Sequence, residues 1–149
     1  MATKKKVGIK VPTKNEILKK YGSMIIQASD TKEPGLWLPS TFFNLNYTLG
    51  GGFPWGKVTE IAGEESSGKT LIALNAAYAC QQLGGSVIWV DAEQSWMNSW
   101  AELNGIDPNK VTVIRDTRIE YISDAVADVA IYLRSQLVNN EPILLVVDS

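Results

Sequence analysis

The pattern of hydrophobic and polar positions along this chain predicts an α/β fold. The strand-like segments are 58–62, 86–90, 111–114 and 143–147. The helix-forming segments between them are 71–79, 95–104 and one from 117 through at least 137, and a further short helix is expected at 42–49. Continuous apolar runs that alternate with helices are typical of parallel strands buried on both faces. We therefore expect a doubly wound, mostly parallel sheet in the order βαβαβαβ.

The first 35 residues differ from the rest of the chain. Residues 1–20 hold seven lysines and one glutamate, a net charge of +6, whereas the remainder carries −8. Residues 1–12 are interpreted as a mobile arm, which either contacts nucleic acid or a neighbouring subunit or is a solvated tail. We divide the chain into 1–35, with the arm, a helix and a linker, and 36–149, the α/β core.

A capping box at Thr13-Lys14-Asn15-Glu16 predicts an amphipathic helix that extends to about Gln27. Its apolar stripe is Ile17, Leu18, Tyr21, Met24, Ile25 and Ala28. The stripe packs either on its own domain or on another protomer, and the sequence does not separate the two.

Composition removes several classes of function. The chain has no histidine, which excludes histidine-based catalysis and argues against a zinc site. Its single cysteine, Cys80, excludes an internal disulfide and is interpreted as packed rather than reactive. No apolar run approaches the length of a membrane span, and no signal peptide follows the lysines. We expect a cytoplasmic protein with no membrane partner.

The stretch Gly63-Glu64-Glu65-Ser66-Ser67-Gly68-Lys69-Thr70 fits the phosphate-binding loop of nucleoside triphosphatases. Glycines let backbone N–H groups surround a phosphate, and the following helix N-terminus adds partial positive charge. Lys69 would reach the β- and γ-phosphates, and the Thr70 hydroxyl would bind Mg²⁺. A strand-like segment before the motif and a helix-forming segment after it provide the expected context.

Acidic residues follow two of the predicted strands. Because ligands bind at the carboxyl ends of parallel strands, Asp91, Glu93 and Asp148 should lie at the edge that holds the phosphate-binding loop. Asp148 would hold Mg²⁺ opposite Thr70. Glu93 is the candidate to position the attacking water, although both Asp91 and Glu93 could merely end a strand in solvent.

Two tryptophans, Trp96 and Trp100, lie four residues apart on the predicted helix 95–104 and should share one face. Such a pair belongs more often to a core than to a ligand platform.

Three stretches resemble the RecA recombinase family: residues 49–70, Val90-Asp91-Ala92-Glu93 and Val146-Val147-Asp148-Ser149. The likeness runs from about Lys19 to Ser149. It implies an ATP- and Mg²⁺-dependent protein that forms a filament on single-stranded DNA and pairs homologous strands in recombination and DNA repair. It also implies that Glu93 is catalytic and that Trp100, where tyrosine is usual, stacks on adenine.

The family's chain continues past the strand that ends at Asp148, into a part with the DNA-binding loops and further strands. We therefore expect this chain to be a fragment, a split product or an interrupted reading frame, with segment 58–62 at an exposed sheet edge. Two alternatives to a DNA-dependent ATPase remain: a non-hydrolysing module that binds subunits through residues 13–28, and a RecA-fold relative such as a helicase or a circadian-clock-type kinase. The sequence of residues 50–70 argues against such a RecA-fold relative.

Overall fold

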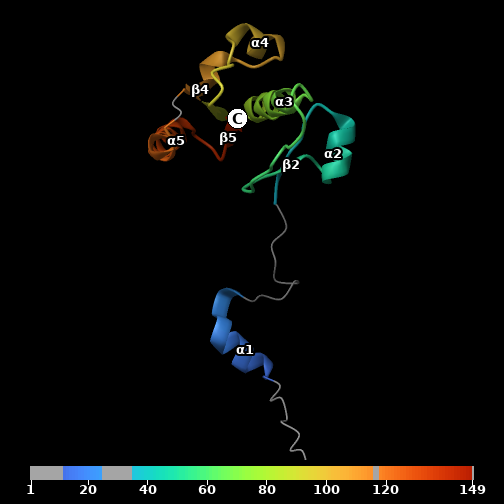
Figure 1. Ribbon diagram of the computed structural model, residues 1–149, viewed down its shortest axis with the longest axis vertical. Coiled ribbons are helices and arrows are strands. Elements are labelled where there is room, and N and C mark those ends of the chain that lie inside the picture. Colours follow the sequence, from blue (N-terminus) through green and yellow to red (C-terminus); the bar gives the residue numbers. More distant parts are fainter. Residues whose placement is uncertain (1–11, 25–34, 116–117, 149) are drawn as a thin grey trace, which may run out of the picture. The chain divides into compact units, whose positions relative to one another are not determined.

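The computed structural model of the chain describes residues 12–24, 35–115 and 118–148. The chain divides into two compact units, Met1–Glu33 and Pro34–Ser149. Figure 1 shows the succession of helices and strands within each unit.

In its described residues, the first unit contains helix α1 (Lys14–Tyr21) followed by a 3₁₀ turn (Gly22–Met24). The predicted capping box is confirmed, because the backbone N–H of Glu16 donates to the Thr13 side chain and the backbone N–H of Thr13 donates to the Glu16 carboxylate. The α-helix is shorter than predicted, and residues 25–28 of the predicted stripe lie outside the described residues. Leu18, Tyr21 and Met24 of that stripe are exposed.

The second unit is built on a three-stranded parallel sheet in the order β4-β3-β5. The strands are β3 (Ser86–Asp91), β4 (Val111–Ile114) and β5 (Ile143–Asp148). Val87 pairs with Val111 on one side and with Leu144 on the other, and the register ends with Asp91 opposite Asp148. Three of the four predicted strands are therefore present, and two of them end in aspartate at the same edge.

Helices cover both faces of this sheet. The side chains of Val87 and Trp89 pack with Leu74, Ala77 and Cys80 of α3 (Lys69–Gln82) in the main hydrophobic core. Ile88 and Val90 alternate with them along β3 and are equally buried, so they point to the opposite face. Helix α5 (Ile119–Gln136) contacts β3, β4 and β5, and Figure 1 shows α3 and α5 on opposite sides of the strands.

A smaller layer precedes the phosphate-binding loop. Strands β1 (Trp37–Leu38) and β2 (Phe53–Pro54) pair antiparallel, and α2 (Phe43–Leu49) lies between them in the chain. The helix predicted at 42–49 is thus confirmed, and it ends at Gly50 in a left-handed conformation. Ser40 N–H donates to the Asn46 side chain, which connects β1 to α2.

The prediction of a strand at Val58–Ala62 is wrong. Residues 57–63 are irregular in the structure, and the Val58 side chain is 97% exposed. A strand needs a neighbour for its backbone N–H and C=O groups. Both edges of β3 are already occupied by β4 and β5, and this segment forms no ladder with the outer edge of β5. The segment therefore reaches the predicted phosphate-binding loop without entering the sheet.

Within the described ranges, no helix has both the length and the apolar character that crossing a membrane would require.

Candidate functional site

The loop Gly63–Gly68 is tightly folded at the start of α3. A Cβ atom on Gly63 would lie 2.7 Å from the Ser67 Oγ, and Gly68 has a φ of 91° as the N-cap of α3. The positive φ of Gly68 favours glycine, whereas a side chain at position 63 would require the Ser67 hydroxyl to move. Ser66, with a φ of 59°, also takes a left-handed conformation. The intervening Glu64, Glu65, Ser66 and Ser67 are exposed, so the loop is accessible to a ligand.

Lys69 closes this loop from the first turn of α3. Its ammonium group donates to the carbonyl oxygen of Gly63 at 3.2 Å and to that of Glu64 at 2.9 Å. The ammonium group therefore lies over the loop rather than in bulk solvent, where a phosphate oxygen could replace a carbonyl as its partner.

Thr70 and Asp148 meet across 78 residues of sequence. The Thr70 hydroxyl donates to Asp148 Oδ1 at 3.3 Å, which joins the first turn of α3 to the end of β5. A hydroxyl and a carboxylate oxygen are hard ligands of the kind that Mg²⁺ takes, and Mg²⁺ usually needs only one or two protein ligands beside water and phosphate. The pair thus fits the predicted magnesium site.

Asp91, at the end of β3, is fully buried and satisfied by internal partners. Its Oδ1 accepts from the backbone N–H of Ser95 at 2.9 Å, and its Oδ2 accepts from that of Trp96 at 3.1 Å. Arg115 approaches Oδ2 to 3.4 Å. The interpretation of Asp91 as a strand end in solvent is therefore wrong: its carboxylate anchors the turn that follows β3.

Glu93 is exposed within that turn. The neighbouring Ala92 N–H donates to the carbonyl oxygen of Asp148, and Gln94 has a φ of 55°. The structure therefore places Glu93 at the same edge as Asp148, with its side chain accessible to a ligand.

The two tryptophans do not share a helical face, because α4 begins only at Asn98 (Asn98–Leu103). Trp96 packs on Trp89 with ring centroids 5.1 Å apart, and its Nε1–H donates to Asn98. Trp100 lies on α4 and is 44% exposed. Trp96 is thus the core residue, and only Trp100 presents an aromatic surface to a ligand.

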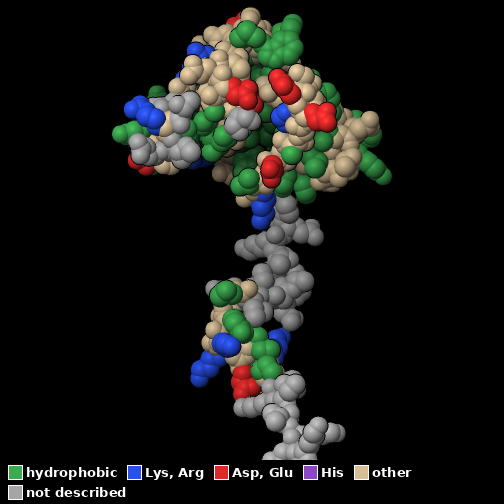
Figure 2. Space-filling view, in the orientation of Figure 1, with side chains coloured by type: hydrophobic (Ala, Val, Ile, Leu, Met, Phe, Trp, Pro, Cys, Tyr) green, Lys and Arg blue, Asp and Glu red, His purple; other side chains and the backbone are tan. Residues whose placement is uncertain are grey.

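Arg115 is the residue that the sequence interpretation missed. It follows β4 directly, so the rule that places Asp91 at the carboxyl edge could have placed Arg115 there as well. Figure 2 shows acidic side chains around a hollow on the visible face of this unit, in keeping with the negative charge of the chain after residue 20.

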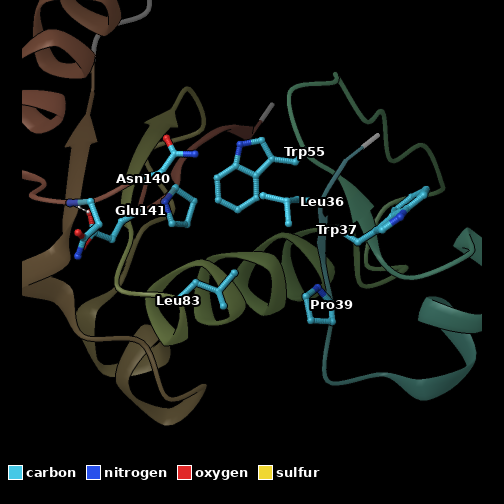
Figure 3. A pocket seen from close by; sticks show the side chains of 9 residues that line it. Leu36, Trp37, Pro39, Trp55, Leu83, Asn140 and Glu141 are labelled. Atoms are coloured by element: carbon cyan, nitrogen blue, oxygen red, sulfur yellow. Dashed lines mark hydrogen bonds between the residues drawn. The ribbon is translucent and has the colours of Figure 1, made fainter. Parts of the chain in front are cut away.

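A second concavity, of about 620 Å³, lies near the amino ends of β3 and β5 (Figure 3). It is open and mostly apolar, and its lining includes Leu36, Trp37, Trp55, Leu83, Asn140 and Pro142. None of the predicted site residues lines it.

Comparison with known proteins decides the family. A family model described as the RecA N-terminal domain matches residues 10–149. The chain belongs to the RecA family. The predicted resemblance is therefore confirmed, and with it the RecA-like α/β fold class.

Three curated relatives, each named Protein RecA, illustrate the similarity. The chain is 37% identical to the protein of Malacoplasma penetrans over 90% of its own length and 39% of the relative's. It is 32% identical to that of Picosynechococcus sp. over 91% and 37%, and 31% identical to that of Bacteroides thetaiotaomicron over 100% and 44%. The chain thus spans less than half the length of these relatives.

Proposed function

We propose that this chain is the ATP- and Mg²⁺-binding part of a RecA-family recombinase. In the proposed function, ATP hydrolysis depends on single-stranded DNA and serves homologous recombination and DNA repair in the cytoplasm. The contact between Thr70 and Asp148 carries the proposal, because it brings two oxygen ligands together beside the phosphate-binding loop.

Each residue of the site has a role in this proposal. Backbone N–H groups of residues 64–70 bind the phosphates, and Lys69 exchanges a loop carbonyl for a phosphate oxygen. Thr70 and Asp148 hold Mg²⁺, which when bound neutralises charge on the phosphate oxygens. Glu93 orients the attacking water, and Trp100 stacks on the adenine ring.

We further propose that single-stranded DNA and other copies of the chain are the partners, as the family membership suggests. The lysine-rich start of the chain, with a net charge of +6 over residues 1–20, is suited to contact with phosphates. Self-association would form a filament along the DNA.

A second candidate function is a subunit-interaction module that binds neighbouring subunits through residues 13–28 and does not hydrolyse ATP. The exposed Leu18, Tyr21 and Met24 on and after α1 favour it, because an apolar stripe of this kind is suited to another protein surface. The match to the RecA N-terminal domain favours either candidate over a helicase-type ATPase.

An ATPase assay with and without single-stranded DNA separates the two candidates. We expect Mg²⁺-dependent turnover that DNA stimulates, and a loss of at least about tenfold in Asp148→Asn, which keeps the shape of the side chain. Asp124→Asn, on the exposed face of α5, is the matched control and should retain turnover. ATP binding and self-association without turnover would favour the interaction module.

A further inference from the structure

The turn that follows β3 is held by the buried side chain of Asp91, a role that the sequence alone does not predict. Asp91 is 0% exposed, and both of its carboxylate oxygens accept hydrogen bonds from the backbone of residues 95 and 96. The Ser95 hydroxyl also donates to Asp91 Oδ1, at 3.5 Å. One buried side chain thus closes a loop of six residues, with Glu93 near its middle.

Arg115 crosses to this turn from the neighbouring strand. Its Nε lies 3.4 Å from Asp91 Oδ2, and its Nη2 donates to the carbonyl oxygen of Trp96 at 3.0 Å. The Arg115 side chain is 54% exposed, so the ion pair by itself adds little to stability. Its geometry is more informative, because one guanidinium group bridges the beginning and the end of the turn.

The other side of the turn is tied to the predicted magnesium site. The backbone N–H of Ala92 donates to the carbonyl oxygen of Asp148 at 3.2 Å, and the Asp148 carboxylate accepts from Thr70. Glu93 therefore lies between two anchors. One connects to Thr70 at the start of α3, and the other connects to Arg115 at the end of β4.

We propose that Asp91 and Arg115 are positioning residues that act through Glu93. They fix the conformation of turn 91–96, including the left-handed Gln94, so that the Glu93 carboxylate is presented at the carboxyl edge of the sheet. The inference rests on the proposed function, because it assigns a role in ATP hydrolysis to two residues outside the proposed phosphate and Mg²⁺ contacts. A positioning contribution of this kind acts on the orientation of the reacting water and not on phosphate binding.

The test compares Arg115→Ala with Arg134→Ala in the full chain. Arg134 is a matched control, because it also donates to backbone carbonyls, those of Asn139 and Glu141, ahead of the amino end of β5. Arg115→Ala should lower kcat about 10- to 100-fold with an unchanged ATP affinity. It should also speed amide hydrogen exchange at Ser95 and Trp96. Arg115→Lys can donate to only some of these acceptors, so its kcat should lie between those of the parent and the alanine variant.

A double variant separates positioning from a general structural effect. If Arg115 acts through Glu93, adding Arg115→Ala to Glu93→Gln should cost no further activity. Multiplicative losses in the double variant, or full kcat in Arg115→Ala, would overturn this proposal alone. Asp91→Asn provides a second variant, which should show the same split between kcat and affinity. A parent chain that neither binds nor hydrolyses ATP would overturn the proposed function, and this inference with it.

Discussion

At the scale of single residues, the site is organised by polar contacts between parts of the chain that are distant in sequence. Lys69 closes the loop from which it emerges, Thr70 reaches Asp148, and Asp91 holds the turn that carries Glu93. In the proposed function Lys69, Thr70 and Asp148 exchange these contacts for a ligand, whereas Asp91 keeps its contacts and holds the turn. The residues that remain accessible, Glu93 and Trp100, are those with proposed roles toward water and adenine.

Replacing Glu93 by Gln tests its role in hydrolysis. The amide keeps the shape and removes the charge, so ATP affinity should persist while turnover falls by about 10²–10⁴. Turnover and equilibrium ATP binding are measured on the same preparation, with Glu102→Gln on the exposed side of α4 as the control. Parental turnover in Glu93→Gln would reduce Glu93 to a turn residue. Asp91 could not take over its role, because both of its oxygens are already bonded.

The single cysteine gives a prediction that is independent of function. Burial raises the pKa of the Cys80 thiol to about 11, from an ordinary value of 9.0. At pH 9 the native thiol should therefore resist alkylation by iodoacetamide, whereas the unfolded chain should react readily.

The same shift has a consequence for stability. Because the unfolded state loses its thiol proton first, the free energy of unfolding should fall as pH rises from about 9 to about 11. Denaturant unfolding across this range, compared with Cys80→Ala, measures the contribution. Equal alkylation rates for native and unfolded chain would contradict the buried position.

At the scale of elements, the hydrophobic pattern predicted three of the strands correctly and one wrongly. The strands at 86–90, 111–114 and 143–147 are confirmed within a residue or so, because short continuous apolar runs that alternate with helices suit a parallel sheet. The expected burial on both faces holds for β3 but not for β5, on which Leu145 and Val147 are exposed. The segment 58–62 has a strand-like alternation as well, yet it forms no strand. Pairing depends on a neighbour at the right place in the sheet, and a local pattern does not contain that information.

The candidate site, too, could be predicted from the sequence only in part. The juxtaposition of Thr70 and Asp148 could be predicted, because a motif and a strand end both point to one edge. The bridge from Arg115 to Asp91 could not, because it depends on the register of β4 against β3 and on the inward direction of the Asp91 side chain. Trp96 was misplaced because the start of α4 lies three residues later than the pattern suggested.

The outer edge of β5 gives a prediction at this scale. Within the described residues β5 is an edge strand, and Val147 is 62% exposed on it, so the chain should associate at high concentration. Val147→Lys should suppress this association and change the free energy of unfolding by no more than about 0.5 kcal/mol, the usual range for a surface position.

Light scattering over a range of concentrations measures the effect. Val138→Lys, which adds the same charge at an exposed position outside the strands, is the control and should leave association unchanged. A parent chain that stays monomeric at every concentration, or equal suppression by both variants, would show that the edge is not responsible.

At the scale of the whole molecule, family membership and local geometry support the proposal at different levels. The match over residues 10–149 shows the family, whereas the relatives are more than twice as long as the part that this chain covers. What the described residues provide is a loop closed by Lys69, a contact between Thr70 and Asp148, and an anchored turn that carries Glu93. The central claim is therefore that this chain itself binds ATP with Mg²⁺.

Equilibrium titration of the purified chain with ATP, with and without Mg²⁺, tests that claim most directly. We predict saturable binding that Mg²⁺ strengthens and that Lys69→Ala weakens by about 1.5–3 kcal/mol, the usual contribution of a charged hydrogen bond. Lys110→Ala, at the amino end of β4, removes the same charge at the opposite edge of the sheet and should bind like the parent. Equal affinities of the parent and Lys69→Ala, or no binding by the parent, would contradict the account.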